Sequence, residues 1–481
     1  MTVENFSPVF KEIPFENPQD IYAKLRAKNS FLLESCKGPE QIARYSFVGF
    51  DPYLIFKVKN SVVEIEFFGK KTISARHPVE RLRELVDAYK QELIPDLPPF
   101  QGGAVGMLSY DFVRYIEKIP NDSPDDLNIP DAHFFMIDKL IAFDHVNHKS
   151  WIIVCPGARE TVLGYSEING NRENMVKEAG DVLDSIHQNI ITGDKETEGR
   201  SSPLKKIHVV HDTDKAFYMD MVSKVKEYIS AGDIFQANIS MRLSADIEDA
   251  DPWEIYKLLS KINPSPFASF FDFGEYQIAS SSPERLVRVN GRLVDTRPIA
   301  GTRPRGADIN EDESMRAELL LNEKERAEHI MLIDLERNDL GRVCDYSSVR
   351  VDELMITEDY SHVIHIVSNV QGVLADGKDC FHAIKAVFPG GTITGVPKVR
   401  CMEIIEELEP TKRGPYTGSI GYIGFNGNMD LNIIIRTFVI KERRAYVQAG
   451  AGIVADSDPE REYYESLKKA EALIKTLDEI K

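Results

Sequence analysis

The chain has 481 residues, of which 42% are hydrophobic and 28% are charged, and its formal net charge is −19. This length exceeds the size at which a single core usually stops growing, so we expect two domains or one large composite fold. The acidic charge disfavours a protein that binds nucleic acid through a basic face, and no apolar run is long enough to cross a membrane. A small anionic substrate remains compatible, because local charge decides its binding.

The cysteines and the N-terminus indicate where the protein works. The five cysteines are scattered and form no CxxC pair, which is typical of a reduced protein without disulfides or structural zinc. The first residues, MTVENF, have neither the basic flank nor the apolar core of a signal peptide. We therefore expect a cytoplasmic protein.

The first part of the chain is predicted to form an antiparallel sheet with one amphipathic helix. Alternating apolar residues indicate strands at 53–59 and 62–68, and a further sheet segment at 134–155. Between them, apolar residues recur at helical spacing from 82 to 89.

The segment 192–206 is polar and charged, contains Gly, Ser and Pro, and has no apolar periodicity. Such a composition predicts a linker or exposed loop. It divides the chain into an N-terminal region, 1–191, and a second region, 207–481.

After the linker, Thr213 is expected to cap a helix that Gly232 ends. Strands are expected next at 235–243 and around 277–290. The later elements that we expect are helices near 313–335, 399–408 and 459–477, and strands at 419–425, 430–440 and 445–454. Strands and helices come in blocks without regular alternation, which favours an α+β fold with mainly antiparallel sheets.

Two pairs of glutamates, Glu325 with Glu328 and Glu462 with Glu465, have the i, i+3 spacing of neighbours on one helix face. Lys469 continues the second face one turn later. Four carboxylates brought together from two helices need a cation to stay ionised, and oxygen ligands suit Mg²⁺. Such pairs are also common on solvated helix faces, and spacing alone does not show that the two pairs meet.

Positive charge for an anionic substrate is available at Arg436, Lys469 and Lys398. Arg436 lies in an otherwise apolar strand, where either a bound carboxylate or an internal salt bridge would pair with it. Gly450 and Gly452 lie in a later strand and would let the backbone approach a ligand closely.

The segment 388–398, FPGGTITGVPK, is a turn-rich loop that leads into a helix. Free amides at such a position favour a carboxylate or phosphate, and an ordinary helix start is the alternative. His362 and His365 have alternating spacing, so only one of them can share a face with a given neighbour. A buried, hydrogen-bonded histidine is the alternative to a catalytic one.

Taken together, these motifs resemble those of the chorismate-utilising enzymes, which include anthranilate, aminodeoxychorismate, isochorismate and salicylate synthases. The match is dense from 212 to 477, and 32–35, 43–47 and 101–106 match the members that use ammonia. The resemblance implies an anthranilate synthase component I-like α+β fold, with large composite antiparallel β-sheets flanked by helices.

The resemblance also implies roles for the acidic residues. Mg²⁺ would be held directly by Glu328 and Glu465, with Glu325 and Glu462 acting through water. Glu284, in the motif SSPERL, would be the general acid that protonates the departing C4 hydroxyl. That task requires a carboxyl kept neutral by a dry, anionic pocket.

For the substrate, chorismate, the resemblance implies a polar cradle. Arg436 and Tyr416 would hold the enolpyruvyl carboxylate, and the backbone at Gly450 and Gly452 would help. The residues that complete the lining would be Thr392, Lys469 and, beside the ring, His365.

The nucleophile is indicated by Gln236. Isochorismate and salicylate synthases are similar to one another in placing a lysine base at this position, and glutamine cannot deprotonate water. Ammonia is therefore the expected nucleophile. The chain shows no glutaminase nucleophile motif, so a separate glutamine amidotransferase subunit would supply the ammonia.

Several motifs resemble aminodeoxychorismate synthase component I more than anthranilate synthase component I: SPERL at 282–286, QANIS at 236–240 and NPSPFASF at 263–270. The expected product is 4-amino-4-deoxychorismate, on the route to p-aminobenzoate and folate. Ala300 disagrees, because many aminodeoxychorismate synthases carry there a lysine that attacks C2, whereas anthranilate synthases resemble this chain. The alternative product is therefore anthranilate, formed together with pyruvate.

A tryptophan pocket is implied by the resemblance of 32–35 to that of the family, where it is a regulatory site or a structural filler. Its residues here would be Leu33, Glu34, Ser35, Pro264 and Phe267. A non-catalytic metabolite-binding subunit with the same fold is a further alternative, against which Glu284, Arg436 and Lys469 argue.

Overall fold

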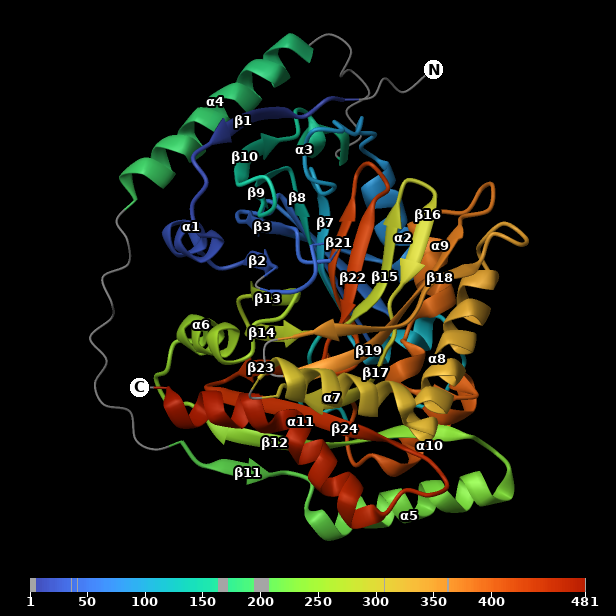
Figure 1. Cartoon of the computed structure of the whole chain (residues 1–481). Coiled ribbons are helices and arrows are strands. Elements are labelled where there is room, and N and C mark those ends of the chain that lie inside the picture. Colours follow the sequence, from blue (N-terminus) through green and yellow to red (C-terminus); the bar gives the residue numbers. More distant parts are fainter. Residues whose placement is uncertain are drawn as a thin grey trace.

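Two large antiparallel sheets organise the chain in the computed structural model, which describes residues 6–35, 37–40, 42–162, 172–193, 207–306, 308–360 and 363–480 (Figure 1). The first sheet has 12 strands. Across the sheet they are β1 (Val9–Ile13), β10 (Lys149–Val154), β9 (Lys139–Asp144), β3 (Tyr45–Gly49), β2 (Ser30–Glu34), β13 (Phe267–Asp272), β14 (Tyr276–Ser282), β23 (Thr437–Lys441), β24 (Arg444–Ile453), β12 (Gln236–Asp246) and β11 (Val209–His211), with β20 (Gly395–Val396) paired to β12.

The second sheet also has 12 strands. Across the sheet they are β17 (Ile299–Pro304), β19 (Val363–Val373), β16 (Leu293–Thr296), β15 (Arg285–Asn290), β22 (Met429–Ile433), β21 (Ser419–Gly424), β7 (Gly103–Leu108), β8 (Ala132–Ile137), β4 (Leu54–Lys59), β5 (Val62–Phe67) and β6 (Lys70–Ser74), with β18 (Arg350–Asp359) paired to β19.

Helices cover the outer faces of the sheets, and apolar side chains fill the space between them. Phe31 and Phe271 of the first sheet share one buried cluster with Val105 and Phe135 of the second. The helices are α1 (Pro18–Leu25), α2 (Pro78–Asp87), α3 (Ala158–Val162), α4 (Arg172–Thr192), α5 (Lys215–Ala231), α6 (Pro252–Ile262), α7 (Ile309–Leu321), α8 (Glu323–Gly341), α9 (Cys380–Val387), α10 (Lys398–Leu408) and α11 (Pro459–Glu479). Short 3₁₀ turns lie at Tyr110–Tyr115 and Gly391–Ile393.

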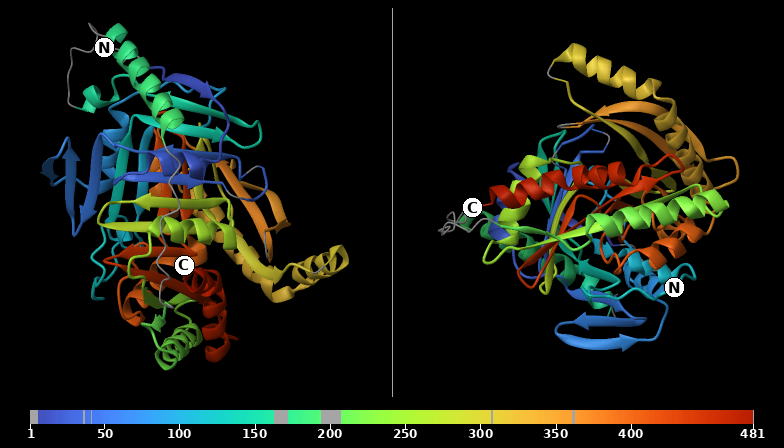
Figure 2. Two further views of the ribbon diagram at one scale, coloured as in Figure 1. Left: turned by 90° about the vertical axis from the view of Figure 1, so that its left-hand side faces the viewer. Right: turned by 90° about the horizontal axis from the view of Figure 1, so that it is seen from below.

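The arrangement of the helices shows where the two glutamate pairs lie. Helix α11 packs along β24 and against α5, at the bottom of the view in Figure 1. Helices α7 and α8, in yellow, pack against β17 and β19, and α7 stands away from the body in Figure 2. No helix in the described ranges combines the length and apolarity that a membrane span requires.

The α+β prediction with antiparallel sheets is confirmed, and two of the predicted helices have different boundaries. Asp214, not Thr213, caps α5, since its side chain accepts from Phe217 N–H, whereas the Thr213 hydroxyl accepts from Arg242 N–H. The helix expected near 313–335 is two helices, because Asn322 is extended and caps α8 by accepting from Glu325 N–H.

Two expected strands, around 277–290 and at 430–440, each turn out to be two strands in different sheets. The chain leaves β14 and enters β15 through Glu284, and it leaves β22 and enters β23 through Arg436, whose φ of 54° is left-handed. The two crossings touch: Ser281 N–H donates to the Arg436 carbonyl at 3.1 Å, and Ile433 N–H donates to the Glu284 carbonyl at 3.0 Å. Both residues are therefore placed where the sheets meet.

The predicted regions 1–191 and 207–481 do not correspond to separate sheets. Strand β7 of the first region pairs with β21 of the second, and β2 pairs with β13. Of the predicted linker, Thr192 ends α4, while 194–206 lie outside the described residues.

Candidate active site

Glu284 is a buried carboxyl at the crossing between the sheets, with 6% of its surface exposed. Burial raises its pKa to about 8, and the nearby Glu336 carboxylate contributes in the same direction. The Thr392 hydroxyl, the backbone N–H of Ile299 and the Lys469 ammonium oppose this rise. The carboxyl is therefore protonated at neutral pH, as a general acid must be.

Arg436 supplies the positive charge at the second crossing. Its guanidinium donates to the Lys469 carbonyl, and Tyr416 lies beside it. Burial lowers its pKa to about 10, so it remains charged at neutral pH. No carboxylate of the described part of the chain contributes to this pKa, so the internal salt bridge expected as one alternative is not what balances the charge.

The first glutamate pair begins α8. Glu325 Oε1 accepts from Arg303 at 2.7 Å, while its Oε2 is buried without a hydrogen-bond partner. Glu328 Oε1 accepts from the Gln236 side-chain amide at 2.9 Å. Helix α8 thus presents carboxylate oxygens toward Gln236, the first residue of β12.

The second pair begins α11. Glu465 forms an i, i+4 ion pair with Lys469 at 2.9 Å, with side-chain exposures of 55% and 36%. Such an exposed pair is worth only about 0.3–0.5 kcal/mol, so the carboxylate is easily redirected. Burial raises the pKa of Glu462, the Glu465 charge adds to the effect, and Lys469 and Lys324 oppose it. Because Lys324 belongs to α8, the first turns of α8 and α11 face each other.

Two glycines of β24 connect these helices. The Lys469 ammonium donates to the Gly450 carbonyl at 3.0 Å. A Cβ on Gly452 would lie 2.3 Å from the Gln236 amide nitrogen and 3.7 Å from Glu328 Oε1, and one on Gly450 would lie 2.5 Å from the Ile239 carbonyl. Only glycine fits at position 450, because the neighbouring atom there belongs to the backbone. A continuous series of neighbouring residues therefore joins α8 to α11. In order, these residues are Glu328, Gln236, Gly452, Gly450, Lys469 and Glu465.

The four glutamates do not form one compact ligand cage. Within the described ranges, no group of three or more His, Cys, Asp or Glu side chains is spaced to hold a metal ion. Mg²⁺ usually takes one or two protein carboxylates and completes its shell with water and substrate oxygens. The carboxylates of Glu328 and Glu465, with the unpartnered oxygen of Glu325, fit that kind of site, and the metal remains a prediction.

His365 is a buried histidine with hydrogen bonds. Its Nδ1 lies 3.1 Å from the Gly301 carbonyl and 3.0 Å from the Thr302 hydroxyl. Burial lowers its pKa to about 4, so the ring is neutral. Because a carbonyl only accepts, Nδ1 carries the proton and Nε2 is the acceptor. Ala300 directly precedes Gly301 in β17. His362 lies outside the described residues.

The structure places buried acidic residues near the site that the sequence did not single out, and it excludes Lys398 as a free cation for the substrate. Lys398 is not a free cation, because it forms an ion pair with the buried Asp339 and donates to the Val387 carbonyl at 3.0 Å. Glu336, one turn before Asp339 on α8, is also buried. The i, i+3 spacing of Glu336 and Asp339 is evident in the sequence, but this spacing does not predict that the two side chains are buried.

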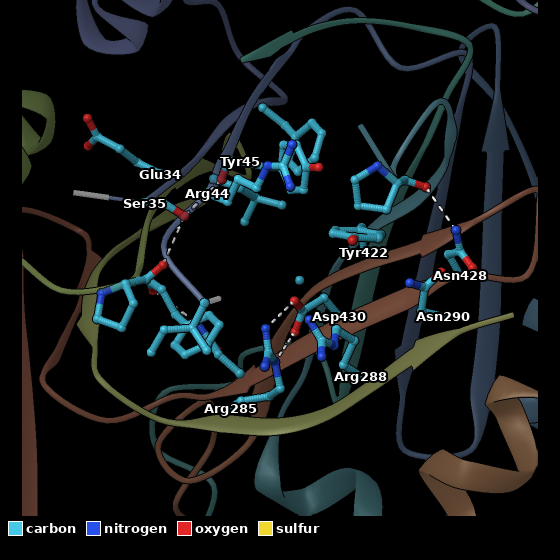
Figure 3. A pocket seen from close by; sticks show the side chains of 18 of the residues that line it. Glu34, Ser35, Arg44, Tyr45, Arg285, Arg288, Asn290, Tyr422, Asn428 and Asp430 are labelled. Atoms are coloured by element: carbon cyan, nitrogen blue, oxygen red, sulfur yellow. Dashed lines mark hydrogen bonds and ion pairs between the residues drawn. The ribbon is translucent and has the colours of Figure 1, made fainter. Parts of the chain in front are cut away.

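A cavity of about 470 Å³ lies apart from these groups, between β2, β15 and β22 (Figure 3). Leu33, Glu34, Ser35 and Phe267 line it as predicted, whereas the wall contains Pro266 and not Pro264. The Ser35 hydroxyl donates to the Tyr45 carbonyl, and Glu34 accepts from the Tyr256 hydroxyl at 2.6 Å. On the far wall Arg285, the residue after Glu284, pairs with Asp430.

Comparison with known proteins identifies the relatives of this chain. The model of the chorismate binding enzyme family matches residues 17–475. Anthranilate synthase component 1 of Acetivibrio thermocellus is 44% identical over 484 residues, covering 99% of this chain and 96% of that protein. Aminodeoxychorismate synthase component 1 of Bacillus subtilis is 44% identical over 480 residues, covering 98% and 97%.

The fold is shared with a solved structure. The crystal structure of anthranilate synthase component I from Streptococcus pneumoniae superposes with a TM-score of 0.78 at 36% identity, covering 90% of this chain and 92% of that one. The predicted anthranilate synthase component I-like fold is thereby confirmed. The chain belongs to the chorismate binding enzyme family.

Proposed function

We propose that the protein aminates chorismate to 4-amino-4-deoxychorismate, with Mg²⁺ as cofactor and ammonia from a separate glutamine amidotransferase subunit. The observation that carries the proposal is the neutral, buried Glu284 acting beside the cations Lys469 and Arg436, in a site where Gln236 takes the place of a base. A relative with this activity in its name, from Bacillus subtilis, is 44% identical.

Glu284 carries the chemical step in this proposal. Its proton passes to the C4 hydroxyl oxygen, the C4–O bond breaks with its electron pair on oxygen, and the hydroxyl leaves as water. Ammonia supplies the new C–N bond and loses one proton, so chorismate and ammonia give the product and water. Mg²⁺ held by Glu328 and Glu465, with Glu325 and Glu462 acting through water, would neutralise the ring carboxylate.

The remaining residues orient the substrate. Arg436 and Tyr416 hold the enolpyruvyl carboxylate bidentately, and the absence of side chains at Gly450 and Gly452 lets it approach β24 closely. The residues that line the rest of the site are Thr392, Lys469 and the neutral ring of His365.

Anthranilate synthesis is the second candidate, and two observations favour it. Ala300 cannot form a bond to C2, and several of the related proteins are named anthranilate synthase component 1. Incubating the protein with chorismate, Mg²⁺ and an ammonium salt separates the two. We expect p-aminobenzoate only after aminodeoxychorismate lyase is added, whereas fluorescent anthranilate without a lyase would establish the second candidate.

Gln236→Lys tests why ammonia is the nucleophile. In the native chain the amide donates to Glu328 and cannot accept a proton from water. A lysine whose pKa is lowered by partial burial can act as a base, so we expect the variant to form some isochorismate. Chromatography of the products measures the isochorismate. The control is Gln448→Lys, which introduces the same residue on the neighbouring strand β24. The complete absence of isochorismate would refute the base argument.

We also propose that the cavity lined by Ser35 and Phe267 binds tryptophan. Its volume of about 470 Å³ and its mixture of apolar and charged walls suit an amphipathic aromatic amino acid. Ser35→Phe should fill the cavity and abolish the heat of tryptophan binding in calorimetry. The amination rate without tryptophan should stay within about twofold, as expected for a change outside the catalytic groups. Equal binding by both proteins would contradict this location.

A further inference from the structure

A second buried carboxyl, Glu336, lies behind the proposed acid Glu284. Glu336 is on α8, about two turns beyond Glu328, and only 4% of its surface is exposed. The Thr296 hydroxyl donates to its Oε2 at 3.1 Å, and the backbone N–H of Gly391 lies near the carboxylate. A Cβ on Gly391 would lie 3.8 Å from its Oε1.

The same two segments of chain hold both carboxyls. In the connection from β16 to β17, the Thr296 hydroxyl donates to Glu336 and the Ile299 N–H lies close to the Glu284 carboxyl. In the 3₁₀ turn, Gly391 lies beside Glu336, and the next residue, Thr392, lies close to Glu284, with its hydroxyl buried and without a hydrogen-bond partner. The two carboxyls therefore lie beside the same two backbone segments, and the charge of Glu336 acts on Glu284.

Other charged groups face Glu336 from α8 and from the segment before α10. Asp339, one turn later on α8, is buried and forms an ion pair with Lys398. Arg342 and Glu117 act on Asp339 from outside, and Lys469 acts on Glu284 from the substrate side. Burial raises the pKa of Glu336, Asp339 adds to this, and Lys398 opposes it.

We propose that Glu336 is a positioning residue for the acid: its carboxyl, held by the segments that hold Glu284, keeps Glu284 in the proton-bearing form that the reaction needs. This inference rests on the proposed function, in which Glu284 protonates a departing hydroxyl. Glu336 is 4% exposed and accepts from Thr296, so the proposal assigns it no contact with the substrate. Two like charges cannot both form in a dry region, so the last proton of the pair leaves at a higher pH than it would leave Glu284 alone.

Glu336→Gln tests the inference, because the amide keeps the shape and the hydrogen bond from Thr296 but has no charge. The alkaline limb of the kcat profile should move to lower pH by about one unit, so that kcat near about pH 8.5 falls roughly tenfold. Near about pH 6, where Glu284 is protonated in both proteins, kcat should stay within about twofold. KM should change little. In Glu336→Asp, which keeps a carboxyl, the alkaline limb of the kcat profile should return most of the way to its native pH.

Asp334→Asn is the matched control, since it is the same carboxyl-to-amide change on the exposed face of α8, where the side chain is 61% exposed. Its profile should coincide with that of the native protein. A limb that stays in place in Glu336→Gln, or a loss of kcat that is equal at every pH, would overturn the inference and leave Glu336 a purely structural group.

Infrared difference titration of the carboxyl band gives a readout that does not depend on turnover. The band lost in Glu284→Gln identifies the acid, and in Glu336→Gln we expect that band to disappear at a lower pH than in the native protein. If this shift occurs while no amination product forms from chorismate, the inference holds and the proposed function fails. If the product forms and the band does not shift, only the inference fails.

Discussion

Replacing Glu284 with Gln is expected to lower kcat for chorismate amination by about 10²–10⁴-fold, the usual contribution of a positioned general acid. The amide has the same shape but no acidic proton, so the C4 hydroxyl would have to leave unprotonated. Arg436 and Tyr416 still hold the substrate, and KM should therefore change by only about threefold. Initial rates from chorismate loss, measured with ammonium salt in excess, provide both constants.

The pH dependence of the native protein belongs to the same prediction. Burial raises the pKa of Glu284 to about 8, and the acid works only when protonated, so kcat should be sustained below that pH and fall as pH rises through it. Glu275→Gln, at an exposed position, is the matched control. A Glu284→Gln protein with native kcat, or one that retains the alkaline fall, would remove Glu284 from the mechanism.

Replacing Glu328 with Gln should abolish Mg²⁺-dependent turnover, because it removes a proposed direct ligand of the metal. Since changes even to groups behind the ligands cost about 10–100-fold in metal affinity, we expect a loss of at least about 100-fold here. Calorimetry with Mn²⁺ in place of Mg²⁺ measures this independently of activity. The hydrogen bond from Gln236 can be kept by the carbonyl oxygen of the new amide, so the fold should be preserved.

Glu323→Gln, an exposed position in the first turn of the same helix, is the control for Glu328 and should retain native affinity and rate. A Glu328→Gln protein that remains fully active and still requires Mg²⁺ would contradict the direct-ligand role. Such a result would move the metal toward Glu325, whose Oε2 lacks a partner.

Apolar patterning predicted the strands and helices, but it could not show where the chain changes sheet. The run 430–440 reads as one strand because its apolar residues continue through Ile434 and Ile435. The left-handed φ of Arg436 and the move to the other sheet depend on distant partners, among them the Ser281 N–H that binds its carbonyl. Similarly, the short turn at Glu284 separates two strands that seemed to be one.

The candidate site was predicted by residue type and motif, while the contacts between those residues were not. The hydrogen bond from Gln236 to Glu328 joins positions 92 residues apart, and no spacing rule reaches that far. Lys398 looked like a free cation, yet the burial of Asp339 determines its partner. Glu336 was overlooked because a glutamate on a helix is normally solvated.

The residues that line the cavity were predicted more completely than the contacts of the candidate active site. Four of its five predicted residues line it, because Leu33, Glu34 and Ser35 are consecutive in β2 and Phe267 begins the neighbouring strand β13. A motif that lies within paired strands keeps its members together, so the prediction needed little knowledge of the rest of the fold. Pro264 precedes the strand, and Pro266 takes its place on the wall.

Locating the metal tests the central claim most directly. Crystals grown with chorismate and Mn²⁺ would show the ion by its anomalous scattering. We expect one peak between the carboxylates of residues 328 and 465, with the substrate's ring carboxylate beside it and Arg436 at its other carboxylate. A bound substrate with the ion elsewhere, or with no ion between these two helices, would contradict the account.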